Sequence, residues 1–345
     1  MHLPQSISAS TYQASMARRL QRRAEVVGRI TLAAVPGMID EYLSMCVSIF
    51  KGFGVIFDDA EIKHLRQALK TELDIAFAAS SRSEIVVTYE CPIGLVVNYH
   101  VKAQWHGIDA EYEKWLSTRK PPLFGVAPDA RVWELALNAQ TPEHFPILDI
   151  GAGTGRNALP LARRGHAVDA IEMTAKFAQI LTDEAKSEGL PVRVLQHDIF
   201  DAIDELRHDY QLVILSEVVP DFRTVDQLRK VFKLAADALA KNGRFVLNTF
   251  LPKQGYIPDD ISRELGQQFY SAIFTHLEIA TALYGLPLEL ESDLSAYNYE
   301  KTHLPAAAWP PTSWYEEWAC GQDVFDVPSE HSPIELRWLT YRKTE

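Results

Sequence analysis

A short stretch that joins an apolar run to a glycine-rich turn constrains this 345-residue chain most strongly. Residues 147–157 read Ile-Leu-Asp-Ile-Gly-Ala-Gly-Thr-Gly-Arg-Asn. A strand that turns sharply into a helix needs residues without a Cβ, because positive φ and close backbone approach are costly for other residues. The free backbone amides at the start of a helix favour an electron-rich ligand. The stretch therefore predicts a nucleotide-like cofactor, bound where a strand meets a helix.

Composition narrows the class of protein. The formal net charge of -12 argues against a nucleic-acid partner, which binds to a basic surface. The cysteines Cys46, Cys91 and Cys320 have neither metal nor disulfide spacing, so we expect no metal and a cytoplasmic, reducing location. No apolar run approaches the roughly 20 residues of a membrane span, so no membrane partner is expected either.

Hydrophobic periodicity predicts two domains, 1–107 and 108–345. The first begins with three segments at helical spacing, about 11–33, 37–51 and 59–80. Residues 85–89 and 95–99 are β-branched and aromatic, and they predict a hairpin. We therefore expect an N-terminal helical domain with a β-hairpin. It is expected to bind substrate, to bind a carrier or peptide, or to form a homodimer.

Strands and helices alternate through the second domain. Strands are expected at 146–150, 167–172, 192–197, 212–216 and 244–250, and helices at 108–117, 128–139, 155–164, 174–187 and 224–240. This alternation predicts an α/β fold with a doubly wound parallel sheet and helices on both faces. Residues 323–327 and 334–341 are expected to add an antiparallel edge pair. The segment 252–312 is too long for a connector, and it predicts a cap.

The spacing of the glycines distinguishes between nucleotide cofactors. Gly151, Gly153 and Gly155 are followed by Arg156, where the dinucleotide fingerprint G-x-G-x-x-G requires a third glycine. An arginine at that helix-packing position disfavours NAD and FAD. Pro160 falls inside the expected helix 155–164, where it predicts a kink.

Polar side chains follow four successive strands at their carboxyl ends: Asp149, Glu172, Asp198 with Ile199, and Ser216 with Glu217. The two oxygens of Glu172 can accept hydrogen bonds from both hydroxyls of a ribose. Asp198 can accept one from an adenine amine. Each acid alone also fits a helix cap or a solvated turn. Because ligands of doubly wound sheets bind at these strand ends, the four groups together favour one shared site.

This constellation resembles the class I S-adenosylmethionine-dependent methyltransferases. The matching motif is Leu-Asp-Ile-Gly-Ala-Gly-Thr-Gly at 148–155, together with the four strand ends. Gly155-Arg156-Asn157, Gly165-His166-Ala167-Val168 and Ile171-Glu172-Met173-Thr174 resemble, more narrowly, the tellurite-resistance-type branch that acts on small molecules. The resemblance covers about 108–250 and the final hairpin. The N-terminal domain and the segment 252–312 have no counterpart in compact members of that branch, which indicates a specialised substrate.

The resemblance implies a mostly parallel, Rossmann-like sheet of seven strands and S-adenosyl-L-methionine as the cofactor. The cofactor-binding residues that it implies are Asp149, Gly151, Ala152, Gly153, Gly155, Asn157, Glu172, Met173, Asp198, Ile199, Ser216 and Glu217. Tyr112 and Trp115 match a place where related enzymes close over the cofactor, although simple core packing also accounts for them.

Methyl transfer from a sulfonium mainly requires orientation and a desolvated pocket, and a hydroxyl acceptor also benefits from a base. The expected acceptor is a small molecule or a peptide, methylated at a hydroxyl or carboxylate oxygen. The catalytic candidates are His303, Glu217 and Tyr299, and the substrate-binding candidates are Tyr297, Tyr299, His303, Trp309 and Trp314. Two alternatives stay open at this point, a nicotinamide-dependent oxidoreductase and a non-catalytic cofactor-binding module.

Overall fold

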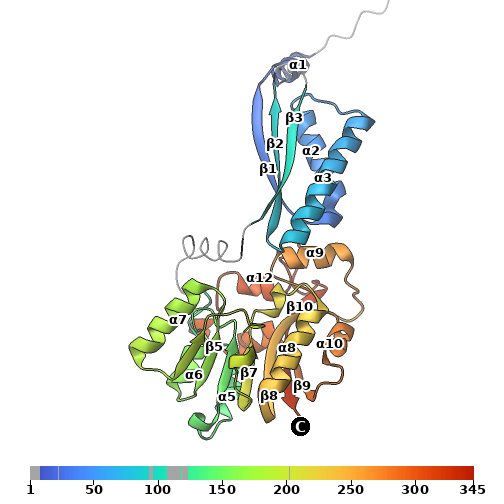
Figure 1. Ribbon diagram of the computed structural model, residues 1–345. Helices are drawn as coiled ribbons and strands as arrows, with labels where there is room; N and C mark the ends of the chain where they lie inside the picture. The colour runs from blue at the N-terminus through green and yellow to red at the C-terminus, as the bar shows by residue number, and fades with distance from the viewer. Residues whose placement is uncertain are drawn as a thin grey trace, which may run out of the picture. The chain divides into compact units, whose positions relative to one another are not determined.

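The computed structural model describes residues 8–21, 23–92, 96–105, 107, 118, 123–201 and 203–345. Contacts between Cα atoms divide the chain into two units, Met1–Gly107 and Ile108–Glu345, which are drawn in Figure 1. Among the described residues, no helix has the length and apolar character needed to cross a membrane.

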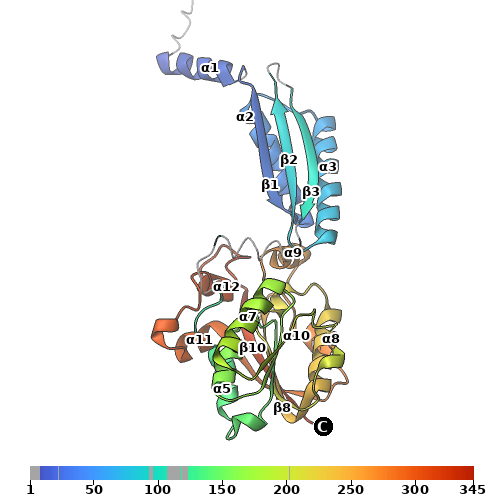
Figure 2. The ribbon, with the colours of Figure 1, turned by 60° about the vertical axis from the view of Figure 1, so that its left-hand side comes forward.

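The first unit is a three-stranded antiparallel sheet with two helices packed on it (Figure 2). Its elements are α1 (Ala9–Gln21), β1 (Val26–Ala33), α2 (Ile39–Gly52), α3 (Asp59–Ala79), β2 (Ser83–Cys91) and β3 (Asn98–Trp105). Asp58 begins α3 with a capping box, because its side chain accepts from the Glu61 amide and the Glu61 side chain accepts in return. Phe50, Leu65 and Leu69 are fully buried in the core of this unit.

One prediction for this unit is wrong. The helix expected over about 11–33 ends at Gln21, and residues 26–33 form strand β1, which pairs with β2 along its whole length. Exposure alternates along β1, so that Val27 is 76% exposed while Ile30 is partly buried in the core. The β-branched residues of this strand favour extended structure. Helices α2 and α3 lie where helices were expected, at 37–51 and 59–80. Strands β2 and β3 pair antiparallel as a hairpin does, but β3 lies at Asn98–Trp105 and not at the expected 95–99.

The second unit contains a seven-stranded sheet in the order β6-β5-β4-β7-β8-β10-β9. Its strands are β4 (Ile147–Ile150), β5 (Val168–Ile171), β6 (Val192–Leu195), β7 (Tyr210–Leu215), β8 (Leu239–Pro252), β9 (Leu288–Ser295) and β10 (Ile334–Lys343). The first five are parallel, and β10 runs antiparallel to both of its neighbours. The expected doubly wound, mostly parallel sheet is confirmed.

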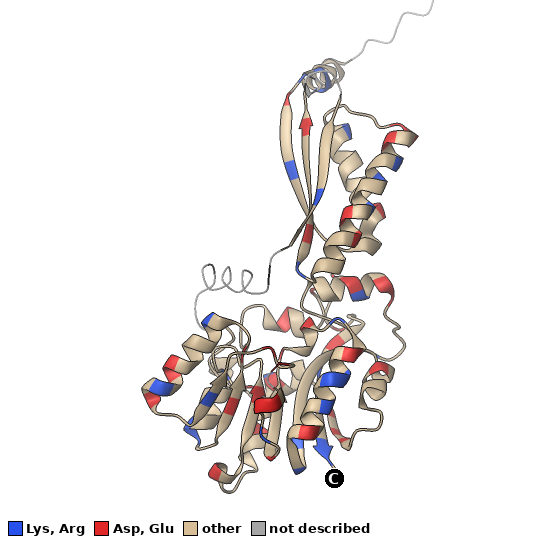
Figure 3. Cartoon of the chain, viewed as in Figure 1, with Lys and Arg blue, Asp and Glu red and all other residues tan. Residues whose placement is uncertain are grey.

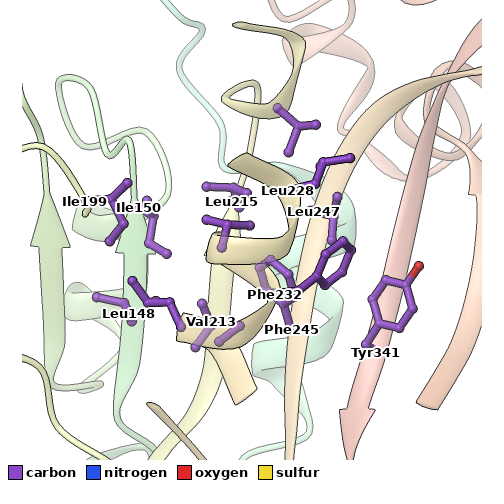
Figure 4. Packing of buried hydrophobic residues seen from close by; sticks show 14 of the residues in the cluster. Leu148, Ile150, Ile199, Val213, Leu215, Leu228, Phe232, Phe245, Leu247 and Tyr341 are labelled. Atoms are coloured by element: carbon purple, nitrogen blue, oxygen red, sulfur yellow. The ribbon is translucent and has the colours of Figure 1, made fainter. Parts of the chain in front are cut away.

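Helices cover both faces of this sheet: α5 (Ala130–Leu137), α6 (Ala158–Arg163), α7 (Ala175–Glu188), α8 (Val225–Ala238), α9 (Asp260–Gln268), α10 (His276–Leu283), α11 (Ala296–His303) and α12 (Tyr315–Ala319). Alternate strand residues enter two separate cores. Leu148 and Val213 pack with Phe232 of α8 on one face, as Figure 4 shows. Ile147 packs with residues of α5, α6 and α7 on the other face. Strands β4, β5 and β7 are therefore buried on both faces, which explains their largely apolar sequences, whereas the edge strand β6 keeps Arg193 exposed.

Three further predictions for the second unit need correction. Residues 323–327 form no strand, and the partner of β10 at the sheet edge is β9, from the segment expected as a cap. Its sequence Leu-Glu-Leu-Glu alternates apolar and charged residues, as suits an edge strand. Helix α6 begins at Ala158, so Pro160 lies in its first turn, where the helix needs no backbone donor and the proline requires no kink. The helix expected at 108–117 lies outside the described residues.

Charged side chains on the helices are mixed in sign. Lys, Arg, Asp and Glu are interspersed along α3 and α8 (Figure 3). Neither helix therefore presents the basic stripe that binds a nucleic-acid backbone.

Candidate functional site

A cavity of 510 Å³ lies at the carboxyl ends of β4, β5, β6 and β7. Its lining comes from the glycine loop after β4 and from the segments that follow the next three strands. Later parts of the chain complete it with Phe269, Tyr270, Trp314, Trp318 and Asp323. Ligands of doubly wound sheets bind at this edge, so the cavity is the candidate active site.

The glycine loop forms one wall of the cavity. Gly151 and Gly153 line it with φ of 72° and 56°, values that favour glycine. A Cβ on Gly151 would lie 2.3 Å from Cγ2 of Val218, so this position has no room for a side chain. Gly155 has a different place from the one expected. A Cβ there would lie 2.5 Å from Cδ1 of Leu181, which shows that Gly155 serves the packing of the loop on α7 and does not line the cavity.

Glu172, at the end of β5, is oriented by backbone amides. Its Oε2 accepts from the Gly153 amide at 2.9 Å, and its Oε1 accepts from the Thr174 amide at 2.7 Å. The carboxylate therefore links the glycine loop to the start of α7. A carboxylate offers about four acceptor positions, so these bonds orient it for a ligand in the cavity.

Asp149 is the buried acid at the end of β4. Its side chain lines the cavity, and among the described residues its Oδ2 has no hydrogen-bond partner. Burial, together with the charge of Asp129, raises the pKa of Asp149 to about 7, and the charge of Arg156 opposes this shift. An unsatisfied buried oxygen is costly, so this site suits a donor or a cation supplied by a ligand.

The adenine-side candidates come together after β6. Asp198 and Ile199 line the cavity with Met173, and Oδ1 of Asp198 accepts from the Phe200 amide at 2.8 Å. His197 also lines the cavity, and its Nε2 lies 3.4 Å from Oε1 of Glu205. An acid beside apolar side chains can bind both the edge and the face of a base.

A buried ion cluster connects the glycine loop to the end of β7. Nη1 of Arg156 lies 3.1 Å from Oδ1 of Asp129, and its Nη2 donates to Oε1 of Glu217 at 2.7 Å. Asp129 also accepts from the hydroxyl of Ser216 at 2.7 Å and from the side-chain amide of Asn157 at 2.9 Å. Two carboxylates thus share one guanidinium, and the whole cluster is held in one arrangement.

Glu217 presents its carboxylate to the cavity from a constrained backbone. Its φ is 59°, which is uncommon for a residue with a side chain, and its amide donates to Oδ1 of Asn248 at 2.7 Å. Burial raises the pKa of Glu217; Arg156 lowers it and Asp129 raises it again. A carboxylate with a raised pKa is a better proton acceptor near neutral pH.

The structure places one of the predicted substrate-binding residues in the cavity lining and the others outside it. Trp314 lines the cavity, whereas Tyr297, Tyr299, His303 and Trp309 are not among its lining residues. The hydroxyl of Tyr299 donates to Glu134 at 2.6 Å, and its ring stacks on His303. Helix α11 turns Ala296 and Glu300 inward, which leaves these aromatic residues on its other sides. His303 and Tyr299 are therefore not placed to act on a ligand in the cavity.

Sequence reasoning missed several lining residues and could not test two others. Tyr112 and Trp115 lie outside the described residues. Arg156 was considered as an argument against NAD and as part of the narrower resemblance, but not as a site residue. Asp129, which pairs with Arg156 and is not itself a lining residue, was not considered. Trp318 follows Trp314 at helical spacing, a signal that was available in the sequence. Tyr270 gave no such signal, because the left-handed φ of 54° that places it depends on the fold.

Comparison with known proteins agrees with this geometry. Residues 147–243 match the family model of a methyltransferase domain. The chain is 27% identical, over 237 aligned residues, to the probable non-canonical nonribosomal peptide synthetase CymA of Salinispora arenicola, covering 60% of this chain and 3% of that protein. It is 32% identical over 114 residues to a ubiquinone biosynthesis O-methyltransferase of Rickettsia felis, covering 32% and 44%. The match thus spans less than half of each relative's length.

Among solved structures, the chain is similar to a geranyl diphosphate C-methyltransferase of Streptomyces coelicolor A3(2). The TM-score is 0.47 at 15% identity, covering 62% of this chain and 78% of that one.

The sheet order, the glycine loop and the family match together define a class I methyltransferase domain. Residues 147–243 thus correspond to a methyltransferase domain, and the cofactor of this domain is S-adenosyl-L-methionine. The nicotinamide alternative is thereby set aside. The resemblance to the tellurite-resistance-type branch stays a prediction.

Proposed function

We propose that this chain transfers a methyl group from S-adenosyl-L-methionine to a hydroxyl oxygen of a small molecule. The observation that carries this proposal is a cavity lined by both Asp149, whose Oδ2 has no partner in the described part of the chain, and Glu217, whose carboxylate is held by Arg156. Its volume of 510 Å³ lies within the range of about 300–1,000 Å³ that small-molecule sites occupy.

The residues present fit the cofactor. Oδ2 of Asp149 would accept from the amino group of the methionine moiety, which supplies the missing donor. Glu172, oriented by two amides, would accept from the ribose hydroxyls. Asp198 would bind the edge of the adenine, and Met173 and Ile199 would pack beside the ring.

When bound, S-adenosyl-L-methionine supplies a methyl group from its sulfonium, and the electron pair of the broken C–S bond stays on sulfur. Glu217 would accept the proton of the acceptor hydroxyl while the new C–O bond forms. Arg156 would hold the Glu217 carboxylate in place, because the same guanidinium is also paired with Asp129, which fixes its position. The aromatic side chains of the cavity would exclude water from the reacting atoms.

One observation supports a hydroxyl acceptor over a carboxylate acceptor. The cavity lining contains several acids, which would repel a second carboxylate. The name of one relative, an O-methyltransferase, supports oxygen as the acceptor atom in either case.

The proposal is tested by measuring the formation of S-adenosylhomocysteine with a panel of small alcohols, phenols, amines and thiols. We expect turnover with hydroxyl acceptors. We also expect Glu217→Gln to lower kcat by about 100-fold, the lower end of the range for a lost general base, while S-adenosylhomocysteine still binds. Asp226→Asn, an exposed change on α8, is the matched control. Turnover confined to amines or thiols, or a Glu217→Gln variant as fast as the native protein, would contradict the proposal.

A further inference from the structure

Asp129 is a buried carboxylate that collects hydrogen bonds from two segments of the site. It precedes α5, and it is not among the cavity-lining residues that the structure describes. Its Oδ1 lies 3.1 Å from Nη1 of Arg156, and its Oδ2 accepts from Nη2 of the same guanidinium at 3.2 Å. Oδ2 also accepts from the Ser216 hydroxyl at 2.7 Å and from the Asn157 side chain at 2.9 Å. Asp129 thus joins the end of the glycine loop to the end of β7.

Arg156 is shared between two carboxylates. Its Nη2 donates to Oε1 of Glu217 at 2.7 Å, while the same guanidinium is paired with Asp129. A guanidinium paired with a single carboxylate stabilises the charged form of that carboxylate, and so weakens it as a proton acceptor. Here a second carboxylate offsets this effect. Burial raises the pKa of Glu217, Arg156 lowers it, and the charge of Asp129 raises it again.

The same two charges act on Asp149, on the cofactor side of the cavity. Burial, followed by the charge of Asp129, raises the pKa of Asp149 to about 7, and Arg156 opposes this shift. The charge of Glu172 makes a smaller contribution in the same direction as Asp129. Asp129 therefore acts on one acid on each side of the cavity, although it is not itself among the described lining residues.

Two further ionisable groups interact with this cluster, from α11 and α12. Burial, followed by the charge of Asp129, raises the pKa of Glu300 to about 7. Burial and the charges of Glu300, Glu217 and Asp129 raise the pKa of Tyr315 well above its usual value, so its hydroxyl is uncharged near neutral pH. Because Asp129 also acts on Glu300, a test at Asp129 needs a second variant that changes the charge of Arg156.

We infer that Asp129 is a positioning residue that shares Arg156 with Glu217, so that the guanidinium orients this carboxylate without removing its capacity to accept a proton. The inference rests on the proposed function, because it concerns the step assigned to Glu217. The effect of Asp129 on Asp149 does not depend on that step, and cofactor binding alone measures it.

The first experiment measures the affinity of the full chain for S-adenosylhomocysteine by calorimetry from about pH 5.5 to about pH 8.5. We expect Asp129→Asn to move the midpoint of the pH dependence down by about one unit, and Arg156→Gln to move it up. A residue that only supported the fold would weaken binding at every pH and leave the midpoint in place. Asp183→Asn, which removes an exposed charge on α7, is the matched control and should leave the midpoint unchanged.

A double variant keeps the test decisive if Asp129→Asn alone does not fold, which circular dichroism detects. Adding Asp129→Asn to Arg156→Gln removes both charges of the pair, and the midpoint should then lie below that of Arg156→Gln alone.

The second experiment follows kcat against pH with the best hydroxyl acceptor. Glu217 should be a weaker proton acceptor in Asp129→Asn, so we expect the low-pH limb of the profile to move to lower pH. The plateau of kcat should fall by about threefold or more, while the KM of the acceptor changes little.

The outcomes separate this inference from the proposed function. If the native chain does not bind S-adenosylhomocysteine or does not turn over a hydroxyl acceptor, the proposed function fails. If it does both, an unmoved midpoint and an unmoved low-pH limb in Asp129→Asn would overturn the inference. Midpoint shifts of Asp129→Asn and Arg156→Gln in the same direction would also overturn it, because opposite charges must act in opposite senses.

Discussion

At the scale of single residues, the site contains backbone conformations and a buried polar atom that are unfavourable in free energy and that core packing does not explain. Glu217 and Tyr270 both have positive φ, with values of 59° and 54°, and both line the cavity. Asp149 buries an oxygen without a partner among the described residues. Such costs concentrate where a protein binds or reacts with a ligand. The three residues belong to different segments, and the fold brings them to one space.

The raised pKa of Asp149 predicts how the affinity for S-adenosylhomocysteine depends on pH. Because the pKa of its buried carboxyl is raised to about 7, the carboxylate that attracts an ammonium forms only as the pH rises through that value. We expect the affinity for S-adenosylhomocysteine to rise by up to about tenfold per pH unit below about 7 and then to level off. Calorimetry from about pH 5.5 to about pH 8.5 measures this dependence.

The isosteric Asp149→Asn variant should bind more weakly and show a flat pH profile. Asp183→Asn, at an exposed position on α7, should keep the native profile. A native affinity that falls with rising pH, or an Asp149→Asn variant with the same slope as the native protein, would remove Asp149 from the binding site.

At the scale of elements, one buried side chain joins three of them. Glu300 on α11 accepts from the Ala130 amide at 2.7 Å and from the Arg131 amide at 3.2 Å, both at the start of α5. It also accepts from Nε1 of Trp338 in β10 at 2.9 Å. The start of α5 follows Asp129, so this contact supports the ion cluster that holds Glu217. Carboxylates stabilise helix starts through their free amides.

Glu300→Gln should lower the free energy of unfolding by about 2 kcal/mol, since an amide nitrogen replaces an acceptor that faces donors.

Burial raises the pKa of Glu300 to about 7, above its unfolded value. The stability that the native protein gains from this group is therefore full below about 4.5 and is lost as the pH rises through about 7. Urea unfolding at several pH values should show the difference between native and variant shrinking as the pH rises. Glu330→Gln, at an exposed position, is the control. A difference that grows with pH would contradict this account.

The sequence predicted elements well where one periodicity was clear. The parallel strands and the helices between them followed from short apolar runs such as the Leu-Val-Ile-Leu of β7, and α3 followed from its cap at Asp58. Strand β1 was misread because Val26, Val27 and Ile30 fit helical spacing as well as alternation. Strand β9 was not predicted because its many charged residues obscure the alternating pattern of a half-buried edge strand. Trp314 was predicted and the helical spacing of Trp318 was visible in the sequence, but the contact of Trp318 with Tyr270 could not be predicted, because it joins distant segments.

At the scale of the whole molecule, the candidate site belongs to one unit. The lining residues that the structure describes all lie between Phe124 and Asp323, within the unit Ile108–Glu345. The unit Met1–Gly107 has its own sheet and its own hydrophobic core. The described lining residues on the expected cofactor side follow from the strand ends of the second unit.

The choice of cofactor is the central claim, and one measurement tests it most directly. The full 345-residue chain is titrated by calorimetry with S-adenosylhomocysteine and, in parallel, with NADH. The account predicts saturable binding of S-adenosylhomocysteine at one site per chain and no measurable heat with NADH. Tight binding of NADH with no response to S-adenosylhomocysteine would contradict it.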